Sequence, residues 1–179
     1  MLTSADHPPT GPSAEVSTTA AAPLAQVWAV FVPIDLAEVF PKGSGPIPAV
    51  LRTSGQTGSW DVVGSARQVH LADGSVVREE ILACDPCDGA APTNGRARFA
   101  YRVGGFSGPL ARLTEAAFGE WTFVEVAPGR TEISWRYTFV PRSALMAAPL
   151  SLLIALFWRT YMRRGIENVR RLAEAGFPN

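Results

Sequence analysis

Residues 143–175 read SALMAAPLSLLIALFWRTYMRRGIENVRRLAEA, and this stretch decides the fold. It contains no glycine before Gly165, and its large apolar residues recur every three or four positions, as on one face of an α-helix. We predict one long helix that bends or begins again at Pro149. From there to Ala175 it would be about 40 Å long, enough to cross a small sheet. The predicted inward face consists of Leu150, Leu153, Ile154, Phe157, Tyr161, Val169 and Leu172.

The sequence upstream of this helix alternates between apolar and polar residues, which is typical of half-buried strands. Asp73-Gly74 supplies the turn of one predicted hairpin, and Pro128-Gly129 the turn of another. The predicted strands are 14–20, 60–71, 75–84, 97–103, 113–126 and 131–140, with a strand-like segment at 47–51 inside a long loop at 41–59.

Two short helices are expected after the first strand. Pro23 stands at the first position of a segment with helical apolar spacing, and Pro33 ends that segment. Residues 35–40 can form a second turn of helix. The sequence therefore predicts an α+β domain, in which a curved antiparallel sheet wraps around the long C-terminal helix.

Length and composition favour a single domain. The chain has 179 residues, 47% of them hydrophobic, and its 16 basic and 16 acidic side chains cancel, so nucleic acid is not an expected partner. Residues 1–13 and 176–179 are predicted tails around a domain at 14–175. The N-terminus has no basic segment followed by an apolar one, so we expect a cytoplasmic protein.

Residues 144–158 are apolar enough to suggest either packing on the sheet or contact with a membrane. The apolar run is shorter than the ~20 residues of a spanning helix, and Pro149 and Ser151 interrupt it. Arg159, Arg163 and Arg164 follow, as in helices that lie on a membrane surface. We rank packing on the sheet above membrane contact, and leave surface docking as an alternative.

Several short motifs occur in the order and spacing of a known superfamily. They are PLAQVW at 23–28, VGSAR at 63–67, DG at 73–74, REE at 78–80, GEWTF at 119–123 and TEISW at 131–135. With these motifs, residues 14–175 resemble the START-related helix-grip superfamily (SRPBCC), and within it the polyketide cyclase/dehydrase-like branch. The resemblance implies a hydrophobic small molecule held between the sheet and the long helix, with no cofactor. Fold alone does not establish an activity.

Arg67 and Glu79 are the candidate catalytic residues. Alternation places both on the same faces as apolar neighbours, so both would point inward. A buried pair of opposite charge either forms an ordinary cross-strand ion pair or anchors a polar group of a ligand. We favour the ion pair. In the other case Arg67 would bind an enolate or carboxylate, and Glu79 would act as a base.

Large side chains on the inward faces are the candidate ligand-binding residues. They line a pocket or fill a core, and the pattern does not distinguish these roles. The candidates are Phe99, Tyr101, Phe106, Trp121, Phe123, Trp135, Tyr137, Leu153, Phe157 and Tyr161. Phe106 lies in a glycine-rich loop at 104–109, which we interpret as a flexible lid with Phe106 as its plug.

The remaining candidates for site chemistry are weak. Cys84 and Cys87 have the spacing of a redox or metal pair, but no second pair accompanies them, and we interpret them as turn residues. His70 is expected to face outward, so neither a metal site nor a nucleophilic triad is predicted. The hypotheses left open are an enzyme of cyclisation or dehydration, a carrier or sensor, and a membrane-surface protein; the oligomeric state stays open as well.

Overall fold

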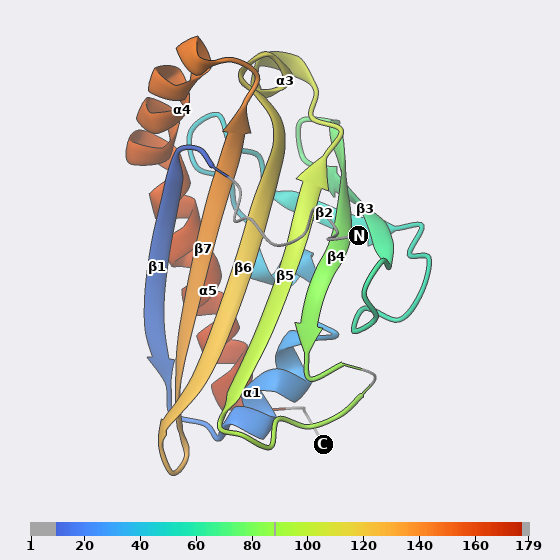
Figure 1. The fold of residues 1–179 in the computed structure, drawn as a ribbon, viewed down its shortest axis with the longest axis vertical. Helices are drawn as coiled ribbons and strands as arrows, with labels where there is room; N and C mark the ends of the chain where they lie inside the picture. The colour runs from blue at the N-terminus through green and yellow to red at the C-terminus, as the bar shows by residue number, and fades with distance from the viewer. Residues whose placement is uncertain (1–9, 88, 177–179) are drawn as a thin grey trace, which may run out of the picture.

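The computed structural model of the protein describes residues 10–87 and 89–176. Seven antiparallel strands form one curved sheet in the order β1-β7-β6-β5-β4-β3-β2, and the long C-terminal helix lies against its concave face (Figure 1). The elements are β1 (Ser13–Ala20), α1 (Leu24–Phe31), α2 (Leu36–Val39), β2 (Val50–Ser54), β3 (Ala66–Leu71), β4 (Val76–Asp85), β5 (Arg96–Gly104), α3 (Gly108–Leu113), β6 (Thr114–Ala127), β7 (Arg130–Pro141), a 3₁₀ turn (Ala144–Met146), α4 (Ala147–Leu153), a π-helical turn (Ile154–Trp158) and α5 (Arg159–Ala175).

The predicted fold class is confirmed: the protein is α+β, with two short helices after the first strand and a long closing helix. Most of the two predicted tails, residues 1–9 and 177–179, lies outside the described residues. Within the described part, the N-terminal tail is shorter than expected. Pro12 accepts a backbone hydrogen bond from Phe139, and Ser13 already belongs to β1.

The hairpin of β3 and β4 turns where the sequence predicts it. Gly74 has a φ of 83°, and the Asp73 carboxylate accepts a hydrogen bond from the Ser75 amide at 3.0 Å. The predicted strand from residue 60 is too long, however, because β3 begins only at Ala66. Residues 60–65 form turns, closed by a backbone hydrogen bond from Ser65 to Val62, and these turns carry the Trp60 ring to the inner side of the sheet.

Two further segments differ from the prediction. The strand expected at 47–51 lies at 50–54, as β2 on the edge of the sheet. The last two residues of the predicted loop at 104–109 are the first two residues of the helix α3, which was not predicted from the sequence. Pro109 sits in the first turn of this helix, where its missing N–H removes no helical hydrogen bond, so Gly108-Pro109 begins a helix here.

The C-terminal helix is unbroken along the chain, but its hydrogen-bonding pattern is not uniform. It begins at Ala147, so Pro149 lies in the first turn of α4 and not at a break. The interruption comes later, at the π-helical turn 154–158, which inserts one extra residue before α5.

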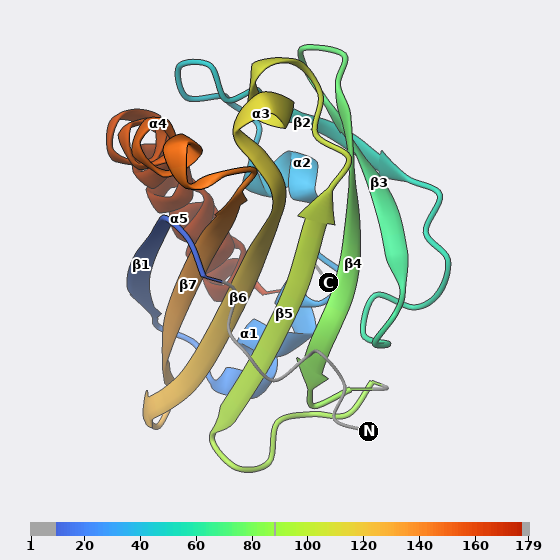
Figure 2. The same ribbon diagram turned by 45° about the horizontal axis from the view of Figure 1, so that its top comes forward.

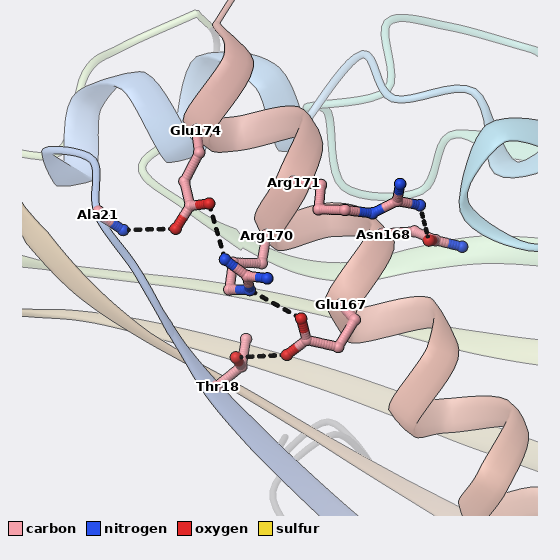
Figure 3. Close-up of polar contacts among 7 residues, drawn as sticks. All are labelled: Thr18, Ala21, Glu167, Asn168, Arg170, Arg171 and Glu174. Atoms are coloured by element: carbon pink, nitrogen blue, oxygen red, sulfur yellow. Dashed lines mark hydrogen bonds and ion pairs between the residues drawn. The ribbon is translucent and has the colours of Figure 1, made fainter.

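Polar contacts fasten the second half of α5 to the end of β1 and to the residue that follows it (Figure 3). The Thr18 hydroxyl donates to Glu167 at 2.8 Å, and the Ala21 amide donates to Glu174 at 2.9 Å. Arg170 donates to both of these carboxylates, at 2.8 and 2.7 Å, and so links the two contacts. The closing helix is therefore fixed to the edge strand beside β7.

Close approach of α5 to α2 depends on Gly165. The Phe40 ring stacks on the Tyr161 ring with centroids 4.6 Å apart, and a Cβ atom at Gly165 would collide with that same Phe40 ring. Gly165 is therefore a packing residue of the helix, and the absence of its side chain places Phe40 against α5.

We predict that Gly165→Ala destabilises the protein. Alanine improves helix propensity by at most about 1 kcal/mol, whereas overpacking costs about 1–3 kcal/mol, so the collision with Phe40 dominates. Urea unfolding measures the change. The exposed Thr160→Ala variant on the same helix is the control and should be neutral or slightly stabilising. A Gly165→Ala protein as stable as this control would contradict the proposed role of the glycine.

Candidate ligand-binding cavity

A cavity of about 220 Å³ lies between the concave face of the sheet and the C-terminal helix. It is far larger than the roughly 10–15 Å³ that holds one water molecule. Its walls are mainly apolar, and it reaches the end of the molecule at which α3 and α4 lie (Figure 2). A second cavity of about 40 Å³ lies on the side of α1 and α2, and shares Leu36, Phe40, Glu79 and Tyr101 with the first.

Period-two alternation on β5 and β7 builds one wall of the larger cavity. Tyr101 and Val103 point inward from β5. Trp135, Tyr137 and Phe139 point inward from β7, where the intervening residues face away from the cavity. Gly119 on β6 faces Tyr101 directly, and a Cβ atom there would occupy the space of the Tyr101 ring. This glycine lets the ring lie flat across the sheet.

Trp158, and not the predicted Phe157, lines the cavity from the closing helix. The four-residue spacing of Leu153, Phe157 and Tyr161 predicts Phe157 inward. Residues five apart share a face across a π-helical turn, so Leu153 and Trp158 line the cavity together, and the Trp158 ring centroid lies 4.7 Å from that of Tyr137 and 5.2 Å from that of Phe139. Phe157 instead packs beside Gly45, and its carbonyl accepts a hydrogen bond from Ser44 at 3.1 Å.

Two indole N–H groups at the cavity are buried without a partner. Among the described residues, Nε1 of Trp135 and Nε1 of Trp158 have no hydrogen-bond acceptor of acceptable geometry, although the Tyr101 hydroxyl lies close enough to the Trp135 indole for this contact to act on the Tyr101 pKa. A buried donor left unpaired costs about 1–3 kcal/mol, so such groups normally have a partner. These two donors therefore point to an acceptor from outside the chain, supplied by water or by a ligand.

Arg67 and Glu79 face each other across β3 and β4 and form an ion pair. Nε of Arg67 donates to Oε2 of Glu79 at 2.9 Å, and both residues are buried. The Arg67 guanidinium also lies 3.8 Å from the centre of the Trp60 ring, a cation–π contact. Glu79 borders both cavities, whereas Arg67 borders only the smaller one.

Burial shifts the protonation of the groups around the cavity. It raises the pKa of the Glu79 carboxyl above its ordinary 4.5, although the positive charge of Arg67 opposes the shift. Burial, reinforced by the Glu79 carboxylate, also raises the pKa of Tyr101, Tyr137 and Tyr161. The three tyrosines, which are all the tyrosines of the chain, therefore stay neutral and can both donate and accept hydrogen bonds.

The predicted ligand-binding residues fall into three groups. Tyr101, Phe106, Trp135, Tyr137, Leu153 and Tyr161 line the larger cavity. Phe99 and Trp121 line the smaller one. Phe123 and Phe157 border neither: Phe123 packs edge-on against Trp28 in the core, and Phe157 lies against the loop at Gly45.

Some cavity residues were missed by the sequence analysis. Phe139 had a usable signal, because it continues the alternation of Trp135 and Tyr137. Trp158 had none, since the spacing of the helix fits Phe157 and Trp158 about equally well. The other residues missed come from α2 and its C-cap, the loop at 46–48, the sheet and its β3–β4 turn, and the segment 107–113. They are Leu36, Phe40, Pro46, Ile47, Pro48, Val50, Val69, Leu71, Asp73, Ser75, Val77, Val103, Ser107, Pro109, Leu110 and Leu113.

The remaining candidates lie away from the cavity. His70 shares a 2.7 Å hydrogen bond with the Ser54 hydroxyl on β2 and is only partly exposed. Cys84 and Cys87 are free thiols at the end of β4, and burial raises the pKa of Cys84. In residues 10–87 and 89–176, no group of three His, Cys, Asp or Glu side chains is arranged to hold a metal ion.

Solved structures with the same fold come from several sources. Ara h 8.0201 superposes with a TM-score of 0.61 at 16% identity, over 92% of this chain and 98% of its own. Ginseng major latex-like protein 151 from Panax ginseng gives 0.58 at 13% identity, over 94% and 100%. An aromatase/cyclase from a Streptomyces species gives 0.59 at 18% identity, over 90% and 93%. At these identities the likeness shows the fold alone.

No protein among the curated sequences matches the chain. A family profile does match, over residues 12–174, which is nearly the whole described structure. Family and fold together indicate binding of a hydrophobic ligand. The chain belongs to the family described as polyketide cyclase / dehydrase and lipid transport.

Proposed function

We propose that the protein binds a neutral, mainly apolar molecule with one or two oxygen acceptors in the cavity between sheet and C-terminal helix. The observation that carries this proposal is the pair of unpartnered indole N–H groups of Trp135 and Trp158 in a mainly apolar wall. Apolar walls supply affinity, and a few placed donors set the orientation of the ligand.

The charges around the cavity favour a neutral ligand over an ionised one. No Arg or Lys side chain is among the described residues that line the larger cavity. Glu79 is the buried acidic residue of its wall, and Arg67 is already engaged in the ion pair with it, so no free positive charge remains there to bind a carboxylate or phosphate. A ketone, quinone or phenol of lipid or polyketide type fits these surroundings.

Calorimetry with matched probes tests this proposal. Acetylnaphthalene carries a carbonyl acceptor, ethylnaphthalene has nearly the same shape without it, and naphthoate carries a charge. We expect the ketone to bind about three to ten times more tightly than the hydrocarbon, the range of one net hydrogen bond. Naphthoate should bind most weakly.

The Trp158→Phe variant keeps an aromatic ring but removes one donor, so it should reduce the preference for the ketone. Trp28→Phe, in the core beside Phe123 and outside both cavities, is the control and should leave that preference unchanged. Equal affinity of the wild-type protein for the ketone and the hydrocarbon would overturn the role of the indoles.

An enzyme of cyclisation or dehydration is the second candidate function. What favours it is Glu79, a buried carboxyl with a raised pKa at the cavity wall, which suits proton transfer to or from a substrate. The indole N–H groups would then stabilise an enolate oxygen. On this hypothesis Glu79→Gln abolishes turnover of a poly-ketone chain with the fold intact, whereas a carrier shows only altered affinity.

The raised pKa of Glu79 predicts a pH dependence of stability. Below pH 4.5 the Glu79 carboxyl is protonated in both the folded and the unfolded protein. Above pH 4.5 the unfolded chain releases this proton while the folded protein keeps it. The wild-type protein therefore loses stability as the pH rises toward the pKa of Glu79 in the folded state. Glu79→Gln lacks this loss. Urea unfolding from pH 4.5 to about pH 8 should show the free energy of unfolding of wild type falling relative to this variant.

The control for this series is Glu80→Gln, on the outward face of β4, which should follow the wild-type curve. A wild-type curve that rises relative to Glu79→Gln over the same range would show that Arg67 outweighs burial, and that Glu79 is an ordinary ionised partner.

A further inference from the structure

The outer side of α4 exposes large apolar residues. Leu145 is 82% exposed, Leu152 59% and Leu156 56%, and Ala148 and Pro149 lie exposed between them. These five residues run from the 3₁₀ turn through α4 into the π-helical turn, and we call them the outer face of α4. Their spacing of three to four residues places them along one stripe of the helix.

The opposite side of the same helix is apolar as well. Leu150 and Ile154 are buried against the sheet, and Leu153 lines the cavity. A helix at the surface of a globular protein normally turns a polar side to water, and one that is apolar all round is normally covered. The outer face of α4 therefore has the composition of a surface that is covered in use.

Positive charge surrounds this face. Arg142, Arg159, Arg163 and Arg164 are exposed, and residues 142–166 contain no Asp or Glu, although the whole chain has no net charge. Arg142 and Arg164 donate to the backbone carbonyls of Ala111 and Gly43, which leaves their charge unneutralised. Arg159 and Arg163 have no carboxylate partner among the described residues.

The helix does not enter a bilayer end-on in this fold. By length and hydropathy alone residues 144–175 could span a membrane, with a mean hydropathy of 1.4 over the most apolar window. However, Tyr161, Met162 and Ile166 are buried in the core, and α5 is fastened to β1 by Glu167 and Glu174. Spanning would require removing this helix from the sheet, whereas docking by the outer face requires no rearrangement.

We propose that the outer face of α4 docks on the surface of a bilayer that contains anionic phospholipid. The leucines would enter the region between headgroups and acyl chains, and the arginines would contact the phosphates. Figures 1 and 2 both show α4 at the outside of the molecule, at the same end as α3. Leu152 would face lipid while its neighbour Leu153 faces the cavity, so an apolar ligand has a short path between bilayer and pocket.

A second copy of the chain fits this face less well. A two-fold contact would bring the same arginines of both copies together without carboxylates between them, and like charges repel. Anionic headgroups, in contrast, complement both the apolar stripe and its charged surroundings. The inference does not depend on which ligand the cavity holds.

Vesicle sedimentation of the full chain tests the proposal. The probe is a phosphatidylcholine vesicle with about one quarter phosphatidylglycerol. Wild type should sediment with these vesicles, and Leu152→Gln/Leu156→Gln should reduce the partition coefficient at least about tenfold. Glutamine keeps high helix propensity, and both positions are exposed, so the fold is retained. Leu51→Gln/Leu82→Gln, at exposed leucines of β2 and β4, is the matched control and should bind like wild type.

Variants of the arginines test the electrostatic part of the proposal. Arg159→Gln/Arg163→Gln should weaken binding about fivefold per arginine on the anionic vesicles and leave the weaker binding to pure phosphatidylcholine unchanged. Absence of wild-type sedimentation, or equal loss in the control pair, would overturn the proposal. So would a wild-type dimer that the Leu152/Leu156 variant converts to a monomer without any change in vesicle binding, because the face would then be a contact between copies.

Discussion

One helix cannot cover the concave face of a seven-stranded sheet, and the rest of the structure follows from this constraint. The closing helix lies along β1 and β7, where Thr18 and the Ala21 amide hold it. The inner side of the remaining strands needs other cover. At one end α1 supplies it with Trp28 and Phe31, whose rings pack on Phe123. At the other end α2, α3 and the loop at 46–48 border the space without filling it, and the cavity remains.

That space is lined by apolar side chains and by hydrogen-bond donors that have no partner. Core packing alone would favour closing the cavity, since tightly packed side chains gain dispersion energy. A buried donor without an acceptor, in addition, costs the free energy of its lost hydrogen bonds to water. Gly119 keeps the Tyr101 ring flat, and the indole donors of Trp135 and Trp158 stay unpaired in the chain itself. The empty protein therefore forgoes some stability at this end, and a bound molecule would restore it through mass action.

The sequence predicted the sheet, its hairpins and the long helix because these depend on local periodicity and turn chemistry. It placed Arg67 and Glu79 inward correctly, since alternation fixes the face of a strand residue, but it did not show that only Glu79 reaches the larger cavity. α3 was missed because Gly108-Pro109 is typical of loops and helix starts alike. Trp158 was missed because Phe157 and Trp158 both lie at helical spacing from Tyr161, and the π-helical turn that gives Leu153 and Trp158 a common face leaves no signal in the apolar pattern.

The π-helical turn also sets how the two halves of the closing helix are rotated about their common axis. Each residue of an α-helix turns the chain by about 100°, and the π-helical turn takes up one residue without that rotation. If 154–158 became regular α-helix with all its residues kept, α4 would rotate by about that angle while α5 stayed in place, and Leu153 would move to the outward position that Leu152 holds. Removal of one residue from the turn would instead leave both faces of α4 where they are. Substitutions that straighten this turn, more than deletions, would therefore let related chains exchange what faces the cavity with what faces outward.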